Sequence, residues 1–197
     1  VNLDDQRLER YVKVLDKYIT YGRNPNAQVR ADYHFDKYLF PSVNFEYGDL
    51  RFGAKLKNRG MAVAYASLPA VAIGLKFGLS PNEIVNGLET FVLDESKEYG
   101  RMLIKDIDGV TVINDTYNAN PSSMGLALKT MEEVNTDGEK YAVIGDMLEL
   151  GDSSLVEHRD MILLASKVNS FVCLFGQEMK KALDSIDNEL DNVKFFE

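Results

Sequence analysis

Few of the features that mark secreted, membrane-spanning or nucleic-acid-binding proteins occur in this sequence. The chain has one cysteine, Cys173, which excludes an internal disulfide and is typical of a reducing compartment, so we predict a cytoplasmic protein. No run approaches the ~20 apolar residues of a membrane span, and no signal peptide is visible. Acidic residues outnumber basic residues by 31 to 22, which argues against nucleic acid or an anionic membrane as a partner.

The ends of the chain also lack features of a complete protein. The sequence opens with Val1 rather than an initiator methionine, and it stops at Glu197, directly after a last strand-like run at 193–196. A doubly wound domain usually has more strands than this chain provides. We therefore expect a processed or excised piece of a longer protein.

The first half of the chain, to about residue 97, mixes short strands with helices. The predicted elements are strands at 33–40 and 43–47 and helices at 61–77 and 81–91. The second of these helices has a clear start, because Ser80 and Glu83 form a capping box around Pro81 at the first helical position.

The second half has a more regular pattern. Three apolar strand-like runs, at 110–113, 141–145 and 171–175, are spaced about thirty residues apart with helical patterns between them. Strand, helix and strand at this interval are typical of βαβ units, so we predict an α/β fold with a parallel sheet. Cys173 lies in the third run, and we expect a buried, inert thiol.

The segment Asn114-Asp115-Thr116-Tyr117-Asn118-Ala119-Asn120-Pro121-Ser122-Ser123-Met124 is the candidate binding loop. It follows the strand at 110–113 and leads into a helix, with Asn120 as the expected N-cap and Pro121 at the first position. Ligands of open α/β sheets bind at such strand ends, where the free N–H groups of the helix favour an anion. The carboxylate of Asp115 suits ribose hydroxyls because it accepts two hydrogen bonds. The alternative is a polar turn with a helix cap.

Four segments of the chain resemble the Mur ligases, and they occur in the order found in that family. They are Asn2-Leu3-Asp4-Asp5, Gly100-Arg101, the loop 114–124, and Val143-Ile144-Gly145-Asp146-Met147-Leu148-Glu149-Leu150-Gly151 with the following Glu157-His158. The last two are specific to the branch that adds D-alanyl-D-alanine, whereas the first two are weak by themselves. The four segments are spread along nearly the whole chain, so the resemblance is not confined to one part of it.

The resemblance implies a division into two domains. Residues 1–97 would be the C-terminal part of the central ATP-binding domain. Residues 98–197 would be most of a Rossmann-like, parallel-sheet C-terminal domain, incomplete at its end. The charged segment at 94–99 is poor in core residues, and we predict that it is a hinge between the two.

The resemblance also implies a reaction. Mur ligases transfer the γ-phosphoryl group of ATP to the terminal carboxylate of a UDP-muramoyl peptide, and an amine then attacks the acyl phosphate. In this branch the amine belongs to D-alanyl-D-alanine, and Mg²⁺ offsets the phosphate charge. The implied enzyme is a monomeric ATP-dependent ligase of peptidoglycan precursor synthesis, which serves cell-wall biogenesis, cell shape and cell division.

Seven residues receive roles from the resemblance. Arg101, Asp115, Tyr117 and Asn118 would bind ATP, and Asp146, Glu149 and His158 would lie near the incoming dipeptide. Each role has a structural alternative. Arg101 is otherwise a solvated charge, Asp146 and Glu149 are turn and capping residues, and His158 is an exposed residue of the following helix.

The chain departs from the family in two places. It has no Gly-x-x-x-x-Gly-Lys-Ser/Thr phosphate loop, and the family's lysine region and magnesium ligands would also precede Val1, so no catalytic residue is assigned and no metal ligand is expected here. The family's Gly-x-His-Asn-x-x-Asn helix start, used around adenine, aligns with 59–65, which has neither the histidine nor the asparagines. Two other functions therefore stay open: a Mur-type ligase for a different amino acid, and a non-catalytic nucleotide- or peptide-binding module.

Overall fold

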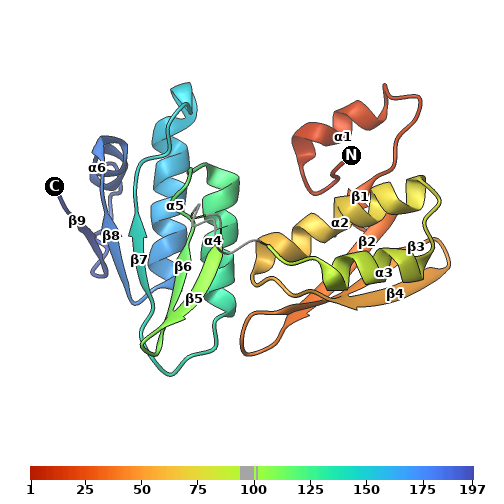
Figure 1. The fold of residues 1–197 in the computed structure, drawn as a ribbon. Coiled ribbons are helices and arrows are strands. Elements are labelled where there is room, and N and C mark those ends of the chain that lie inside the picture. Colours follow the sequence, from red (N-terminus) through yellow and green to blue (C-terminus); the bar gives the residue numbers. More distant parts are fainter. Residues whose placement is uncertain (94–99, 101) are drawn as a thin grey trace. The chain divides into compact units, whose positions relative to one another are not determined.

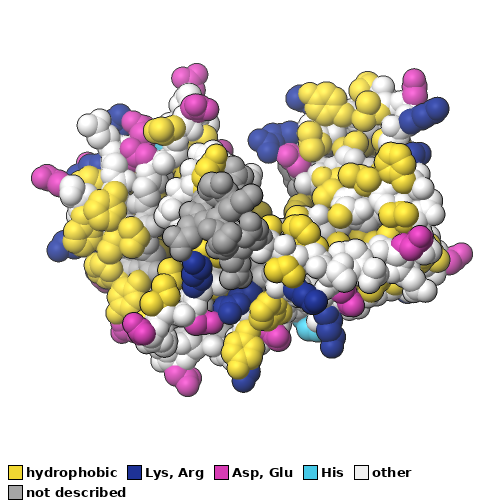
Figure 2. Space-filling model, viewed as in Figure 1, with side chains coloured by type: hydrophobic (Ala, Val, Ile, Leu, Met, Phe, Trp, Pro, Cys, Tyr) yellow, Lys and Arg dark blue, Asp and Glu magenta, His cyan; other side chains and the backbone are white. Residues whose placement is uncertain are grey.

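The computed structural model describes residues 1–93, 100 and 102–197, which form two compact units, Val1–Asp94 and Glu95–Glu197 (Figure 1). The predicted hinge at 94–99 lies outside the described residues. Each unit has its own hydrophobic core. Within the described part of the chain, none of the helices is long and apolar enough to cross a membrane. On the face of each unit shown in Figure 2, acidic and basic side chains are interspersed.

Unit 1, Val1–Asp94, is a four-stranded sheet with two helices on one face (Figure 1). Its elements are α1 Gln6–Val12, β1 Tyr21–Gly22, β2 Val29–Phe35, β3 Pro41–Tyr47, β4 Leu50–Lys55, α2 Met61–Lys76 and α3 Pro81–Thr90. The strands lie in the order β1-β2-β3-β4, with β1 parallel to β2 and the other pairs antiparallel. Fully buried residues such as Phe45 on β3 and Leu68 on α2 form the core between the sheet and the helices.

The helices of unit 1 follow the sequence pattern more closely than its strands do. The predicted capping box of α3 is confirmed, since Ser80 and Glu83 exchange side-chain and backbone hydrogen bonds. The predicted strand at 33–40 is wrong, because β2 ends at Phe35. There the carboxylate of Asp36 accepts hydrogen bonds from the backbone N–H groups of residues 38 and 40, which closes a turn in place of further strand.

Unit 2, Glu95–Glu197, contains a parallel sheet and a separate hairpin. Its elements are β5 Leu103–Ile107, β6 Val110–Asn114, α4 Pro121–Glu133, β7 Tyr141–Ile144, the 3₁₀ helix η1 Gly151–Ser153, α5 Ser154–Val168, β8 Phe171–Leu174, α6 Gln177–Asp184 and β9 Val193–Phe195. The parallel sheet that the βαβ pattern predicts is confirmed for β7-β8-β9. The predicted helix start is also confirmed: Asn120 caps α4 and Pro121 opens it.

The strand β6 differs from the prediction, because it pairs antiparallel with β5 in a sheet of its own. The two strands are joined by Asp108 and Gly109, which both have positive φ, 50° and 84°. That conformation at both turn residues defines the two-residue hairpin turn that Asp-Gly favours. The sequence thus contained a signal for β5, the Asp-Gly pair between two apolar runs, that strand spacing alone did not use.

The core of unit 2 lies on one face of the parallel sheet. Val172 and Leu174 on β8 are fully buried and pack with Ile162 of α5 and Met179 of α6. Cys173, between them in sequence, is only half-buried. Successive residues of a strand point to opposite faces, so the helices cover its neighbours and not the cysteine. The expectation of a buried thiol is therefore wrong, because the side chain of Cys173 is only half-buried.

The start of α6 depends on a glycine and on a carboxylate from another element. Gly176 has φ 99° and ψ 158°, a region that is essentially restricted to glycine. Asp146, which follows β7, accepts hydrogen bonds from the backbone N–H groups of Glu178 and Met179 at 3.2 and 2.8 Å. A Cβ at position 176 would lie 2.3 Å from Cγ of Asp146. The glycine therefore provides both the backbone conformation and the space for this cap.

We expect Gly176→Ala to lower the free energy of unfolding by roughly 1–3 kcal/mol, because the added Cβ strains the backbone and displaces the capping carboxylate. The matched control is Gly125→Ala, within α4, where a Cβ would meet no atom within 4 Å. That change should raise the free energy of unfolding by about 0.5–1 kcal/mol, as alanine favours a helix interior. Denaturant unfolding measures both, and equal effects would contradict this account of α6.

Candidate functional site

The loop after β6 is tied to the residues that precede β5. The N–H of Tyr117 donates to the carbonyl oxygen of Gly100 at 3.0 Å, and the N–H of Met102 donates to Oδ1 of Asp115 at 2.9 Å. Gly100 has φ 54°, and a Cβ there would lie 2.6 Å from Oγ1 of Thr116. The close approach of the two segments therefore requires glycine at position 100.

The three described residues of the predicted ATP set lie on this one loop. Asp115 is half-buried, whereas Tyr117 and Asn118 are exposed. Oδ1 of Asn118 accepts a hydrogen bond from the backbone N–H of Ala119. Directly after these residues α4 begins, so its amino end and the three side chains belong to one short stretch. Arg101, the fourth member of the set, lies outside the described residues.

The loop after β7, residues 145–151, ends at the same end of unit 2 as the loop after β6 (Figure 1). Two of the predicted substrate residues on or near this loop have their polar atoms bonded to other parts of the unit. The carboxylate of Asp146 caps α6, so its turn-and-capping alternative describes its contacts, although the capped helix is α6 and not the one that follows the loop.

His158 is fully buried, so its alternative as an exposed helix residue is wrong. Its Nε2 accepts a hydrogen bond from the backbone N–H of Met147 at 2.9 Å. Its Nδ1 lies 2.7 Å from the carbonyl oxygen of Ser154, and an Nδ1–H donor satisfies both contacts in the neutral ring. Helical periodicity does not show that a polar residue faces the interior. The partner of His158 is the backbone N–H of Met147, a residue that is only 1% exposed, and the sequence gives no sign of this contact.

Ser154, which contacts Nδ1 of His158, also belongs to a network of hydrogen bonds at the surface. Oγ of Ser154 donates to Glu178 at 2.9 Å, and Nζ of Lys181 donates to the same carboxylate at 2.6 Å. The hydrogen bond from Lys181, followed by that from Ser154, holds the pKa of Glu178 below its usual value. The network thus connects the first turns of α5 and α6, the two helices that hold the loop after β7.

Glu149 is the exposed member of the predicted substrate set. Its φ of 63° lies in the left-handed region, which costs a residue other than glycine roughly 1–2 kcal/mol. Its carboxylate has no hydrogen bond or ion pair with any residue that the structure describes. Of the three predicted substrate residues, it alone presents its polar group to solvent.

The opening motif of unit 1 also holds a turn. The carboxylate of Asp4 accepts the backbone N–H groups of Arg23 and Asn24, both at 2.8 Å. Oη of Tyr65, on α2, lies 2.8 Å from Asp4 and 2.9 Å from Oδ1 of Asn2. Burial, followed by the bond to Asp4, raises the pKa of Tyr65, so the phenol stays a donor. Tyr65 lies in the stretch where the family has adenine-contacting residues, and here it binds the opening motif.

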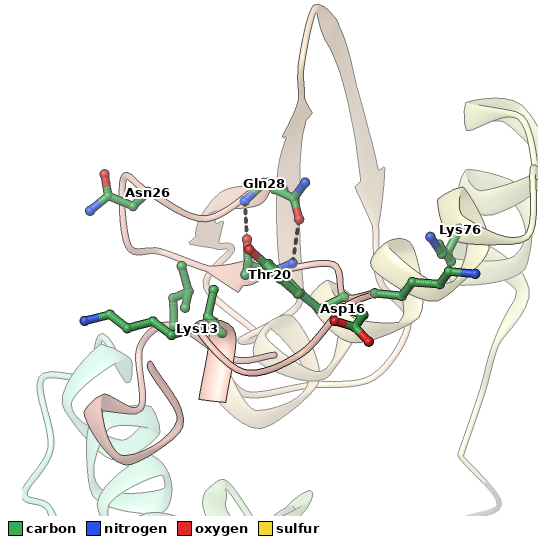
Figure 3. Close-up of a pocket in the computed structure, with 10 residues that line it drawn as sticks. Lys13, Asp16, Thr20, Asn26, Gln28 and Lys76 are labelled. Carbon is green, nitrogen blue, oxygen red and sulfur yellow. Dashed lines mark hydrogen bonds between the residues drawn. The ribbon is translucent and has the colours of Figure 1, made fainter. Parts of the chain in front are cut away.

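A cavity of about 690 Å³ opens elsewhere in unit 1 (Figure 3). It is lined by Leu3, Val12, Lys13, Asp16, Lys17, Tyr18, Thr20, Asn26, Gln28 and Lys76. Thr20 and Gln28 exchange two hydrogen bonds, at 2.9 and 3.0 Å, and the side chains of Lys13 and Lys76 lie at opposite ends of the view. The lining contains none of the predicted site residues, so we assign the cavity no role in the chemistry.

Metal ligands were not expected in this part of the sequence. In residues 1–93, 100 and 102–197, no three His, Cys, Asp or Glu side chains are grouped so that they could hold a metal ion. The described geometry is that of two strand-end loops beside a helix amino end, which suits an anionic ligand and hydroxyl or ammonium groups.

Comparison with known proteins agrees with the motifs. Residues 100–197 match the family described as Mur ligase, glutamate ligase domain. A UDP-N-acetylmuramoyl-tripeptide–D-alanyl-D-alanine ligase of Bacillus subtilis is 37% identical over 94 residues, 48% of this chain and 20% of the relative. The enzyme of that name from Mycobacterium leprae is 33% identical over 183 residues, 84% of this chain and 35% of the relative. The chain thus spans between a fifth and about a third of these relatives.

Solved structures show the same likeness. A crystal structure of MurF from Acinetobacter baumannii has a TM-score of 0.81 and 27% identity, over 100% of this chain and 41% of that chain. MurF of Thermotoga maritima, solved in complex with ADP, shares the fold with a TM-score of 0.74 at 20% identity, over 98% of this chain and 42% of that one. The chain therefore belongs to the Mur ligase family, and residues 100–197 are a C-terminal domain of that family.

Proposed function

We propose that this chain is part of an ATP-dependent amide ligase that joins D-alanyl-D-alanine to a UDP-N-acetylmuramoyl peptide in peptidoglycan precursor synthesis. The observation that supports it best is the segment 114–124, which has the branch-specific sequence and runs from the last residue of β6 into the capped first turn of α4. The curated relatives named above act, by their names, on these substrates. The chain spans 20% of the Bacillus relative and 35% of the Mycobacterium relative.

The loop after β6 is the proposed nucleotide side of the site. Asp115 would accept hydrogen bonds from the ribose hydroxyls, with Tyr117 and Asn118 beside it. The amino end of α4 favours the negative charge of the phosphates, and Arg101 would add a cation there. The Thermotoga relative was solved in complex with ADP, so ADP is a suitable probe of nucleotide binding by this chain.

The loop after β7 is the proposed side for the amine substrate. A carboxylate is a poor electrophile, and the phosphoryl group of ATP makes it reactive, with Mg²⁺ offsetting the charge. What this chain contributes is position: both loops are fixed by backbone hydrogen bonds, so ligands are oriented without reorganisation of the protein. The phosphate loop that would hold the γ-phosphoryl group is absent from these 197 residues.

The proposal includes the domain assignment and the setting of the enzyme. Residues 1–97 would be the C-terminal part of the central ATP-binding domain and residues 98–197 an incomplete C-terminal domain. The half-buried thiol of Cys173, with no other cysteine in the chain, fits a reducing compartment, so we place the enzyme in the cytoplasm, as a monomer that serves cell-wall growth and division.

The 197-residue chain alone should not form the amide. Without a phosphate loop the γ-phosphoryl group is not positioned for transfer. The measurement is phosphate release in the presence of ATP, Mg²⁺, a UDP-muramoyl tripeptide and D-alanyl-D-alanine. Turnover near the ~1–100 s⁻¹ of phosphoryl-transfer enzymes would show that the proposed division of labour is wrong.

In the complete enzyme, Asp115→Asn should weaken ATP binding about ten- to a hundredfold, the loss of a charged hydrogen bond of about 1.5–3 kcal/mol. Asparagine keeps an Oδ1 that can accept the Met102 N–H, so this variant retains that bond to the residues before β5. Asp137→Asn, on an exposed turn, is the control. The KM values for ATP and for the dipeptide separate the two sides of the site. An unchanged ATP constant would make Asp115 a turn residue only.

A further inference from the structure

Two anchors on consecutive residues fix the loop after β7. The Asp146 carboxylate is bonded to the backbone of α6, and the backbone N–H of Met147 is bonded to the imidazole of His158 on α5. Both His158 and the Met147 side chain are buried, at 0% and 1% exposure. The chain therefore leaves β7 along a path that two different helices determine.

The next two residues point out of the unit. Leu148 is 73% exposed, and Glu149, also exposed, has the left-handed φ of 63°. A strained residue persists where its surroundings determine its conformation, and strain of this kind gathers at ligand-binding positions. Here the surroundings are the anchors just before it and the 3₁₀ turn η1 just after it. The strain therefore belongs to an exposed residue whose carboxylate has no hydrogen bond or ion pair with any residue that the structure describes.

We propose that Glu149 binds the ammonium group of an amino acid or short peptide, and that His158 is the positioning residue that holds Glu149 in place through the Met147 amide. A carboxylate and an ammonium group form a charge-assisted hydrogen bond, stronger than a bond between neutral groups. Both carboxylate oxygens of Asp146 and both ring nitrogens of His158 already have protein partners, whereas the carboxylate of Glu149 has none among the described residues. Identification of the amine as that of D-alanyl-D-alanine rests on the proposed function.

The positioning role separates two substitutions of His158. His158→Gln keeps an oxygen that can reach the Met147 N–H. His158→Asn is too short to reach it but can still donate to the Ser154 carbonyl oxygen. Amide hydrogen exchange of Met147 and the three-bond coupling that reports φ of Glu149 are the readouts, and protection of Val172 in the core of unit 2 shows that the fold is intact.

The asparagine variant should exchange the Met147 amide faster and lose the left-handed φ of Glu149, with Val172 still protected, while glutamine restores both. If neither variant alters Met147 or Glu149, His158 is not the positioning residue. If Val172 loses protection in the asparagine variant and not in the glutamine variant, His158 supports the whole unit and the local role is wrong.

The ammonium site is tested by titrating the 197-residue chain with D-alanyl-D-alanine and with its N-acetylated form, which lacks the ammonium group. Backbone shifts at 148–150 should respond to the free dipeptide only. Glu149→Gln should weaken that response about tenfold or more, whereas Asp152→Asn, an exposed acid in η1, should leave it unchanged. Equal responses to the free and the N-acetylated dipeptide would overturn the site, and so would the lack of any response at 148–150 to both free D-alanyl-D-alanine and glycylglycine.

Glycylglycine and ADP distinguish this inference from the proposed function. A response at 148–150 to glycylglycine but not to D-alanyl-D-alanine would support the ammonium site and contradict the proposed substrate. An ADP response at 115–118 without any dipeptide response would support the nucleotide side and overturn the role of Glu149.

Discussion

The hydrogen bond from a backbone N–H to a side-chain acceptor is the interaction on which both candidate loops depend. Asp115 accepts a hydrogen bond from the N–H of Met102, and Asp146 accepts one from the N–H of Met179. His158 accepts one from the N–H of Met147. The first turn of a helix and the residues that flank a strand leave N–H groups without backbone partners, and a buried donor without an acceptor is costly, so each bond fixes the path of the chain there. Asp4 does the same for a turn in unit 1. Polar side chains of the family's motifs thus fix the backbone of the loops in which they lie, or of loops next to them.

This division of roles explains which side chains are available to a ligand. At the loop after β7, Asp146 and His158 accept hydrogen bonds from backbone N–H groups, and Glu149 is exposed in a strained conformation. In the loop after β6, Asp115 accepts a hydrogen bond from the N–H of Met102, and the side chains of Tyr117 and Asn118 are exposed. A motif residue can therefore be essential either because it holds the loop or because it contacts the ligand, and the bonding pattern separates the two.

Much of the fold could be predicted from the sequence because it depends on local signals. The capped start of α4 at Asn120 and the parallel strands β7 to β9 follow from caps and from hydrophobic spacing. The pairing of β6 with β5 was missed because strand spacing says nothing of an intervening hairpin. The burial of His158 could not be predicted because its partner is a backbone N–H, that of Met147, and no pattern of side chains in the sequence indicates such a contact. Partners of that kind emerge only when the tertiary structure is known.

The loops after β6 and β7 are the proposed two sides of one ligase site on a Mur ligase C-terminal domain. The most direct measurement is a structure of the complete enzyme with ADP and D-alanyl-D-alanine bound. We expect the ribose to be bound by Asp115 and the dipeptide ammonium group by Glu149, with Asp146 and His158 still bonded to the backbone. A dipeptide bound by His158 or Asp146 directly, or a ribose away from Asp115, would contradict it.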